Sequence, residues 1–190
     1  HERYVEGVLL TMGGIAIVFP SNAYDLVGLL RTAYFYDSPV AFILEISAAN
    51  SSEFMHLARN WASDEIDLTM PHGVPIESYA IPFGKAKIVR PGGNSPDYTI
   101  SAYGACAVAA AKNEADFLYK EHGINSEVVD LRTVHPLDIE TIKTSVLKSG
   151  RLIILQSENE FRGAGHYIKS KLLEEDEAFW SLLTKPKLID

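Results

Sequence analysis

The stretch GINSEVVDLRTVHPLDIETIKTSVLKSG, residues 123–150, contains a strand, a polar strand end and a capped helix in succession. Ser126 to Leu131 is rich in apolar and β-branched residues and follows a glycine, which predicts a buried strand. Asp138 is suited to the N-cap of a helix that ends at Gly150. The apolar run 151–155 then predicts another strand. Strand, helix and strand in this order form a βαβ unit, so at least part of the sheet is parallel.

The same pattern predicts a second βαβ unit in residues 14–46. Ile15 to Phe19 is a uniformly apolar run typical of a buried strand. Pro20-Ser21 is expected to end this strand and to supply the N-cap of an amphipathic helix. After a turn at residues 37–39, Val40 to Leu44 predicts the next strand.

The remainder of the chain predicts further sheet and helix. Ala86 to Arg90 and Tyr98 to Tyr103 are expected strands, and the Pro- and Gly-rich turn between them favours a hairpin. An alanine-rich helix that ends near Gly123 could approach a sheet closely, and a last helix is expected from Gly165 to about Glu175. We therefore predict an α/β fold with three layers, helices on both faces of mostly parallel sheets, and one antiparallel hairpin.

Composition excludes several classes of function. The chain has 190 residues, 47% of them hydrophobic, with a net charge of −8. The negative charge argues against a nucleic-acid partner, since such partners are bound largely through Lys and Arg. The longest apolar runs fall far short of the roughly 20 residues that cross a bilayer, and no segment resembles a secretion signal, which favours the cytoplasm or an organelle matrix. The only cysteine, Cys106, excludes an internal disulfide and a multi-thiolate metal site.

Few residues suggest chemistry by themselves. His1 stands beside two carboxylates, Glu2 and Glu6, and imidazole with carboxylate is suited to proton transfer. A histidine at position 1 could equally be the remnant of an affinity tag. The turn Gly163-Ala164-Gly165, between a strand and a helix, could offer backbone N–H groups to an anion, but a plain tight turn is the simpler reading.

Other polar residues are more consistent with structural roles. Asp130, Arg132 and His135 are interpreted as a clamp at the strand end, and Cys106 as a small packed side chain. No His, Cys, Asp or Glu pair has zinc-site spacing, so no metal site is predicted. The remaining histidines are expected to be solvated or to cap helices: His56, His72, His122 and His166. On these grounds alone the reaction stays open.

Several blocks, in order along the chain, resemble one family. It is the β subunit, or the β half of a fused chain, of the thiamine-diphosphate-dependent E1 component of 2-oxoacid dehydrogenase complexes, which is related to transketolase. The blocks are GIAIVFPSNAYDLVGLL (14–30), SPVAFILE (38–45), VPIESYAIPFGKA (74–86) and DLRTVHPLD (130–138).

The resemblance implies a domain division and one site residue. Residues 1–46 would be the tail of the pyrimidine-binding domain and 81–190 a domain like the transketolase C-terminal domain. The polar, irregular composition of residues 47–80 independently predicts a linker with one possible short helix. The family has a histidine near the cofactor that acts in proton transfer and in passing the acyl group to lipoate. His1 matches it and Glu6 keeps the motif's spacing, although Glu2-Arg3-Tyr4 replaces the family's Ser-Gln-Ser.

The resemblance also implies a cofactor and partners. Thiamine diphosphate with Mg²⁺ would be bound mostly by segments outside this sequence, so the chain by itself is expected not to bind it. The implied partners are an E1 α subunit or fused α half, the lipoyl-bearing E2 core and a second β copy, and the implied location is the cytoplasm or the mitochondrial matrix. The 2-oxoacid, pyruvate or a branched-chain acid, stays open. Alternatives are an enzyme of the transketolase or deoxyxylulose-phosphate synthase type and a non-catalytic assembly module.

Overall fold

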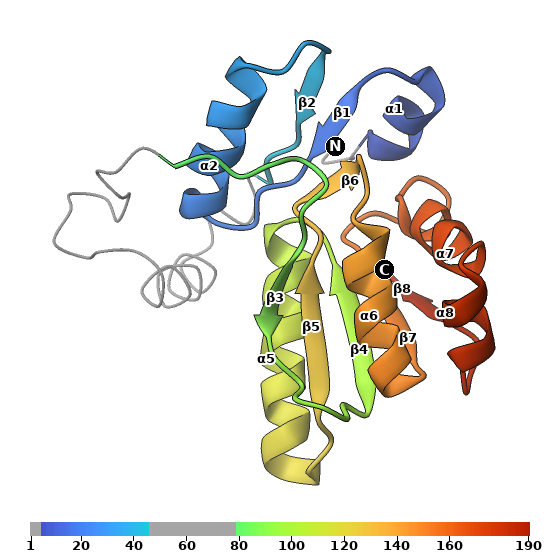
Figure 1. The fold of residues 1–190 in the computed structure, drawn as a ribbon. Coiled ribbons are helices and arrows are strands. Elements are labelled where there is room, and N and C mark those ends of the chain that lie inside the picture. The colour runs from blue at the N-terminus through green and yellow to red at the C-terminus, as the bar shows by residue number, and fades with distance from the viewer. Residues whose placement is uncertain (1–4, 46–78) are drawn as a thin grey trace, which may run out of the picture.

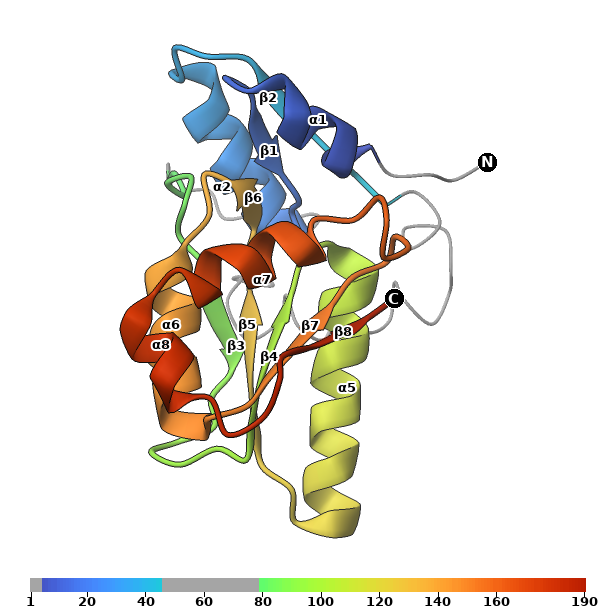
Figure 2. The ribbon, with the colours of Figure 1, turned by 90° about the vertical axis from the view of Figure 1, so that its right-hand side faces the viewer.

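The chain folds into two sheets that lie one above the other (Figure 1). The computed structural model describes residues 5–45 and 79–190. A sheet of three strands has the order β2-β1-β6, and a sheet of five has the order β3-β5-β4-β7-β8. Helices cover the large sheet on both faces (Figure 2). The predicted α/β class is confirmed.

The small sheet contains the predicted βαβ unit. Strands β1 (Ala16–Val18) and β2 (Val40–Phe42) are parallel, and α2 (Ala23–Tyr34) connects them. On its other side β1 pairs antiparallel with β6 (Thr133–His135), which comes from far along the chain. A short helix, α1 (Glu6–Met12), precedes β1. Neither β6 nor α1 was predicted from the sequence.

The predicted N-cap of α2 is wrong by one residue. The side chain of Asn22, not of Ser21, accepts the N–H of Asp25 at 2.8 Å. The Ser21 hydroxyl instead donates to the Asp130 carboxylate. Ser21 therefore connects β5 of the large sheet to the start of α2, a role that local sequence cannot reveal.

The large sheet is mostly parallel. Its strands are β3 (Lys87–Arg90), β4 (Tyr98–Ala102), β5 (Ser126–Asp130), β7 (Leu152–Leu155) and β8 (Lys187–Ile189). Strands β5, β4, β7 and β8 run parallel, and β3 pairs antiparallel with β5.

The predicted hairpin is wrong, because β5 lies between β3 and β4. The Gly-rich connection after β3 passes the N-terminal end of β5, where Gly92 N–H donates to the Glu127 carboxylate. A side chain at Gly92 would lie 2.9 Å from Glu127 Cβ, so the glycine allows this crossing.

Side chains of the large sheet alternate between two cores, as the period of a strand requires. The face with Ile100, Ala102 and Val128 packs against α5 (Ala105–His122), whose alanines allow the close approach that was predicted. The opposite face, with Val129 and Ile154, packs against three helices. They are α6 (Ile139–Ser149), α7 (Gly165–Leu173) and α8 (Asp176–Ser181).

Both caps predicted for α6 are confirmed. Asp138 accepts the N–H of Thr141, and Gly150 takes the left-handed C-cap conformation. Among residues 5–45 and 79–190, no helix is long and apolar enough to cross a membrane. The predicted linker helix lies outside the described residues, and the domain boundaries stay predictions.

Candidate functional site at the junction of the two sheets

Polar side chains gather where strands of the large sheet end. Asp130 ends β5, Tyr103 follows β4 and Gln156 follows β7. The carboxyl ends of parallel strands share one edge of a sheet, which is where α/β folds usually place their sites. Residues 5–45 lie across this edge (Figure 1). Three carboxylates from this N-terminal part, Glu6, Asp25 and Glu45, hydrogen-bond to the C-terminal domain, and we call this region the junction.

The strongest contact across the junction joins Asp25 of α2 to Arg132. The guanidinium donates from Nε to one carboxylate oxygen at 3.0 Å and from NH2 to the other at 2.6 Å. Asp25 is 0% exposed and Arg132 is 9% exposed. A two-pronged bond of this kind fixes both orientation and charge. The predicted pairing of Arg132 with Asp130 is therefore incomplete, since its guanidinium binds Asp25.

Asp130 contributes to the same cluster through the backbone. Its carboxylate accepts the Arg132 N–H at 3.0 Å and the Ser21 hydroxyl. This bond helps to hold Arg132 at a φ of 58°, a region that residues other than glycine rarely adopt. Burial, and then the neighbouring Asp25, raise the pKa of Asp130. Burial, and then Arg132, lower the pKa of Lys87, which lies opposite Asp130 on β3.

The second contact joins α1 to the ends of β4 and β7. The Tyr103 hydroxyl lies 3.2 Å from Glu6 Oε1 and 3.1 Å from Gln156 Oε1, and it accepts the Ala164 N–H at 2.8 Å. Glu6 is 0% exposed. Burial raises the pKa of Glu6 to about 7, and the carboxylates of Glu158 and Glu45 act in the same direction. Burial, and then Glu6, raise the pKa of Tyr103.

The third contact covers the N-terminus of α5. Glu45, just after β2, accepts the N–H of Cys106 at 2.6 Å. The chain passes beneath it at Gly104, with φ of 82°, where a side chain would lie 3.0 Å from the carboxylate. A carboxylate at the start of a helix satisfies a free N–H and interacts favourably with the helix dipole. Cys106 is half-buried, whereas the sequence predicted a packed side chain.

The turn Gly163-Ala164-Gly165 is not an open anion cradle. The Ala164 N–H binds Tyr103, and the Gly165 N–H donates to Gln156 Oε1 at 2.8 Å. A side chain at Gly163 would lie 2.3 Å from that same oxygen. The glycines therefore make room for Gln156, which supports the tight-turn reading and not the phosphate one.

The other predicted residues lie apart from the junction or outside the described residues. His1 falls in the second group, as do His56 and His72, so the structure does not test them. His135 and His122 are exposed, and His166 lies 3.0 Å from Glu160 on the surface. Within residues 5–45 and 79–190, no group of three His, Cys, Asp or Glu side chains is arranged to hold a metal ion.

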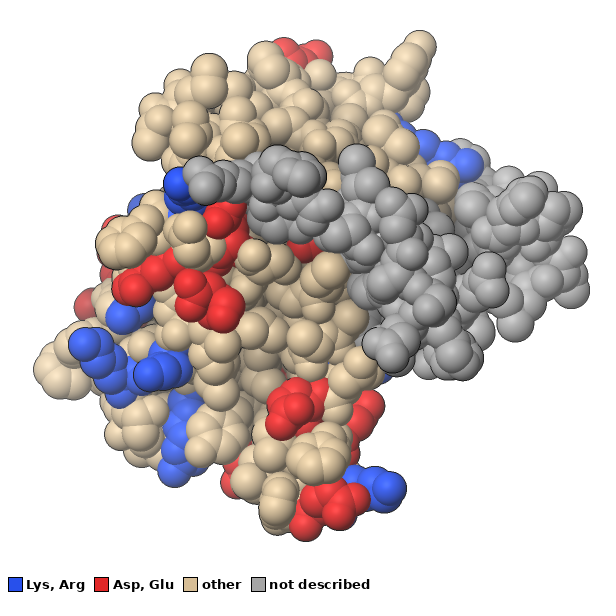
Figure 3. Space-filling model, turned by 180° about the vertical axis from the view of Figure 1, so that it is seen from behind, with Lys and Arg blue, Asp and Glu red and all other residues tan. Residues whose placement is uncertain are grey.

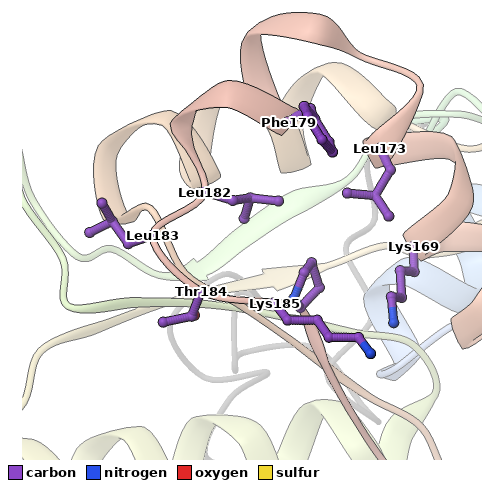
Figure 4. A pocket seen from close by; sticks show the side chains of 8 residues that line it. Lys169, Leu173, Phe179, Leu182, Leu183, Thr184 and Lys185 are labelled. Atoms are coloured by element: carbon purple, nitrogen blue, oxygen red, sulfur yellow. The ribbon is translucent and has the colours of Figure 1, made fainter.

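An open pocket of about 390 Å³ lies away from the junction, between α7, α8 and the segment that leads into β8. Leu173, Phe179 and Leu182 form its apolar floor, and Lys169 and Lys185 extend along one side (Figure 4). The pocket contains none of the junction carboxylates, so we do not assign the candidate site to it.

The N-terminal part exposes large apolar side chains. Tyr34 and Phe35, at the end of α2, are 83% and 82% exposed, and Val8 and Met12 of α1 are exposed as well. The upper part of the molecule in Figure 3 carries few charged residues, in contrast to the lower part. Large exposed apolar patches usually mark a surface that contacts a protein, a membrane or a ligand.

These features define the class of protein. A mostly parallel five-stranded sheet with an antiparallel edge, covered by helices on both faces, carries its polar residues at the carboxyl edge beneath residues 5–45 (Figure 1). The family model for the transketolase C-terminal domain matches residues 84–188. The chain therefore belongs to the family of the transketolase C-terminal domain.

Relatives of known name share the sequence beyond this domain. The chain is 38% identical over 182 residues to the pyruvate dehydrogenase E1 component subunit beta of Bacillus subtilis, covering 96% of this chain and 48% of that protein. The corresponding subunit of Staphylococcus epidermidis is 34% identical over 174 residues, 92% of this chain and 46% of that protein. The chain thus spans about half the length of these curated relatives.

Solved structures share the fold. A split-gene transketolase, described as an inactive beta4 tetramer, superposes with a TM-score of 0.63 at 19% identity, over 92% of this chain and 47% of that one. A transketolase from Campylobacter jejuni gives a TM-score of 0.54 at 14% identity, over 97% and 23%. At these identities the likeness concerns the fold alone.

Proposed function

We propose that the chain is part of the β component of a thiamine-diphosphate-dependent E1 enzyme, which decarboxylates a 2-oxoacid and reductively acylates the lipoyl group of E2. The observation that carries this proposal is the 38% identity over 96% of the chain to a pyruvate dehydrogenase E1 subunit beta. That similarity spans the N-terminal part as well as the C-terminal domain, and it favours pyruvate as the substrate. It also favours E1 over transketolase, since the two transketolase structures named above are only 19% and 14% identical to the chain.

Thiamine diphosphate and Mg²⁺ enter this proposal as the cofactors of the intact enzyme. The Gly163-Ala164-Gly165 turn, where the sequence suggested an anion, has its Ala164 and Gly165 N–H groups bound to side chains. The cofactor would therefore be bound by other segments, above all by an E1 α subunit. The exposed apolar side chains of α1 and α2 are suited to contact such a subunit or a second β copy. The complex would work in the cytoplasm or the mitochondrial matrix.

The proposal is tested on the intact protein together with its α partner. With thiamine diphosphate and Mg²⁺ present, we expect release of CO₂ from pyruvate and acylation of a lipoyl domain. Branched-chain 2-oxoacids serve as the comparison that defines the substrate. Ketol transfer between sugar phosphates without 2-oxoacid decarboxylation would favour the transketolase alternative. If the intact protein keeps its activity after this region is deleted, an assembly module would be favoured.

His1 is the residue we propose to act in proton transfer in this enzyme. A positioned acid-base group typically supplies about 10²- to 10⁴-fold in rate. His1→Ala in the intact protein should therefore lower turnover by about that factor and leave the affinity for thiamine diphosphate nearly unchanged. Turnover within about twofold of wild type would contradict the assignment, as would a gene sequence showing that His1 derives from a vector.

A further inference from the structure

The contact between Glu6 and Tyr103 requires a particular arrangement of protons. The Tyr103 hydroxyl has one hydrogen but faces two acceptor oxygens, Glu6 Oε1 at 3.2 Å and Gln156 Oε1 at 3.1 Å. Gln156 cannot supply the second hydrogen from that oxygen, because its amide is oriented by two other bonds. Its Nε2 donates to the Glu158 carbonyl, and its Oε1 accepts the Gly165 N–H.

A protonated Glu6 satisfies all of these groups. Its O–H can donate to the second lone pair of the Tyr103 oxygen, while Tyr103 donates to Gln156 and accepts from Ala164. If Glu6 were ionised, the single Tyr103 hydrogen could serve only one of the two acceptors. Either Gln156 Oε1 or Glu6 Oε1 would then face the Tyr103 oxygen with no hydrogen between them. The Glu6 Oε2 atom is already buried without a hydrogen-bond partner among the described residues. A full negative charge there would be strongly unfavourable.

Burial and the nearby carboxylates of Glu158 after β7 and Glu45 after β2 raise the pKa of Glu6, while its own backbone N–H and the Tyr103 hydroxyl after β4 lower it, and the net direction is upward. Among the described residues that shift it, none is a cation. This is the opposite of Asp25, whose charge is matched by Arg132.

Glu6 also belongs to the part of α1 that rests most closely on the C-terminal domain. The next residue, Gly7, donates its N–H to the Arg162 carbonyl at 3.0 Å. A side chain at Gly7 would lie 2.2 Å from that oxygen, so backbone meets backbone here. A movement of α1 away from the C-terminal domain would therefore break this backbone contact together with the contact between Glu6 and Tyr103.

We propose that Glu6 is a positioning residue that is protonated in the folded protein. Its neutral carboxyl group holds α1 against the C-terminal domain, and its ionisation weakens this contact. The contact of α1 with the C-terminal domain is tested by itself, and only the effect on activity rests on the proposed function.

The proposal is tested by hydrogen exchange of the peptide 5–12 as a function of pH, with rates divided by those of the unstructured peptide. Glu6 has a pKa of about 7 when seated and 4.5 when free. At a pH between these two values, detachment of α1 lets Glu6 lose its proton. Protection of wild-type α1 should therefore fall by up to about tenfold per pH unit across this range and level off above the higher pKa. Glu6→Gln, which keeps a donor toward Tyr103, should make protection independent of pH.

Two further variants separate this role from a merely structural one. Glu158→Gln removes a nearby negative charge and should move the upper end of the pH response of α1 to lower pH. Glu114→Gln, on the exposed face of α5, makes the same change of charge and should leave the wild-type response intact. A wild-type α1 without pH response, or a Glu6→Gln variant with the wild-type response, would overturn the proposal.

The activity of the intact enzyme gives a second, separate readout. Because the Glu6 side chain is 0% exposed and faces Tyr103, Glu6→Gln should leave KM for the 2-oxoacid unchanged and flatten the pH profile of kcat over the range in which α1 loosens. If the intact protein has no E1 activity, the proposed function fails, while the exchange experiment still decides whether Glu6 seats α1.

Discussion

Two buried carboxyl groups cross the same junction under opposite electrostatic conditions. Asp25 meets the Arg132 guanidinium through two hydrogen bonds, whereas Glu6 meets the neutral hydroxyl of Tyr103. Both side chains are 0% exposed. The difference shows two ways to bury a carboxyl group between domains, one by pairing its charge and the other by removing it with a proton. The contact made by Glu6 should therefore respond to mild changes of pH.

The largest effect is expected when the charge pair is broken. Arg132→Ala leaves Asp25 buried without its partner, and such a change costs about 3–5 kcal/mol in the free energy of unfolding. Urea unfolding followed by circular dichroism measures it. Arg132→Lys keeps the charge but not the two-pronged geometry, so its stability should lie between those of the wild type and Arg132→Ala.

A matched control for this prediction is Glu174→Gln. It breaks the Lys171–Glu174 pair, in which the side chains are 45% and 58% exposed. An exposed pair contributes only about 0–1 kcal/mol. A loss from Arg132→Ala no larger than this control would contradict the structural role of the guanidinium.

Tyr103→Phe removes the hydroxyl from the neutral contact. The Ala164 N–H loses its acceptor and Glu6 loses its partner, and a buried unsatisfied polar group costs about 1–3 kcal/mol. Tyr167→Phe, a half-buried tyrosine on α7, is the control and should change stability by about 0.5 kcal/mol or less. Equal losses for both variants would mean that the Tyr103 hydroxyl does not hold the junction.

A smaller effect is expected at the third contact. Glu45→Ala removes the acceptor of the Cys106 N–H and the charge at the start of α5, which together contribute about 1 kcal/mol. Glu45→Gln keeps an acceptor oxygen and should retain part of this stability in the same urea experiment. If Glu45→Gln is the less stable of the two variants, the cap is not what Glu45 contributes.

Long elements with strong local signals were predicted correctly. Helix α5 with its C-terminal Gly123 and helix α6 with Asp138 and Gly150 follow from spacing and cap residues alone. Two short strands, β6 and β8, were missed, because neither lies in a long apolar run like those that revealed β1 and β2, and each is defined by its pairing with neighbours in space.

Predictions for the candidate site were limited in the same way. Local spacing placed Arg132 beside Asp130, and nothing nearby in sequence pointed to Asp25 of α2. Tyr103 and Gln156 were missed as site residues. A signal was available, since each directly follows an apolar strand of a parallel sheet, where polar residues converge.

Strand β6 makes folding depend on a contact between segments that are far apart in the sequence. It leaves the large sheet after β5 and completes the small sheet against β1, which is formed by residues near the other end of the sequence. Contacts between such distant segments form late and slowly, because a long loop must close first. Until then one side of β1 is an open edge to which another chain can pair. Truncation or circular permutation between the two sheets should therefore promote strand exchange and aggregation.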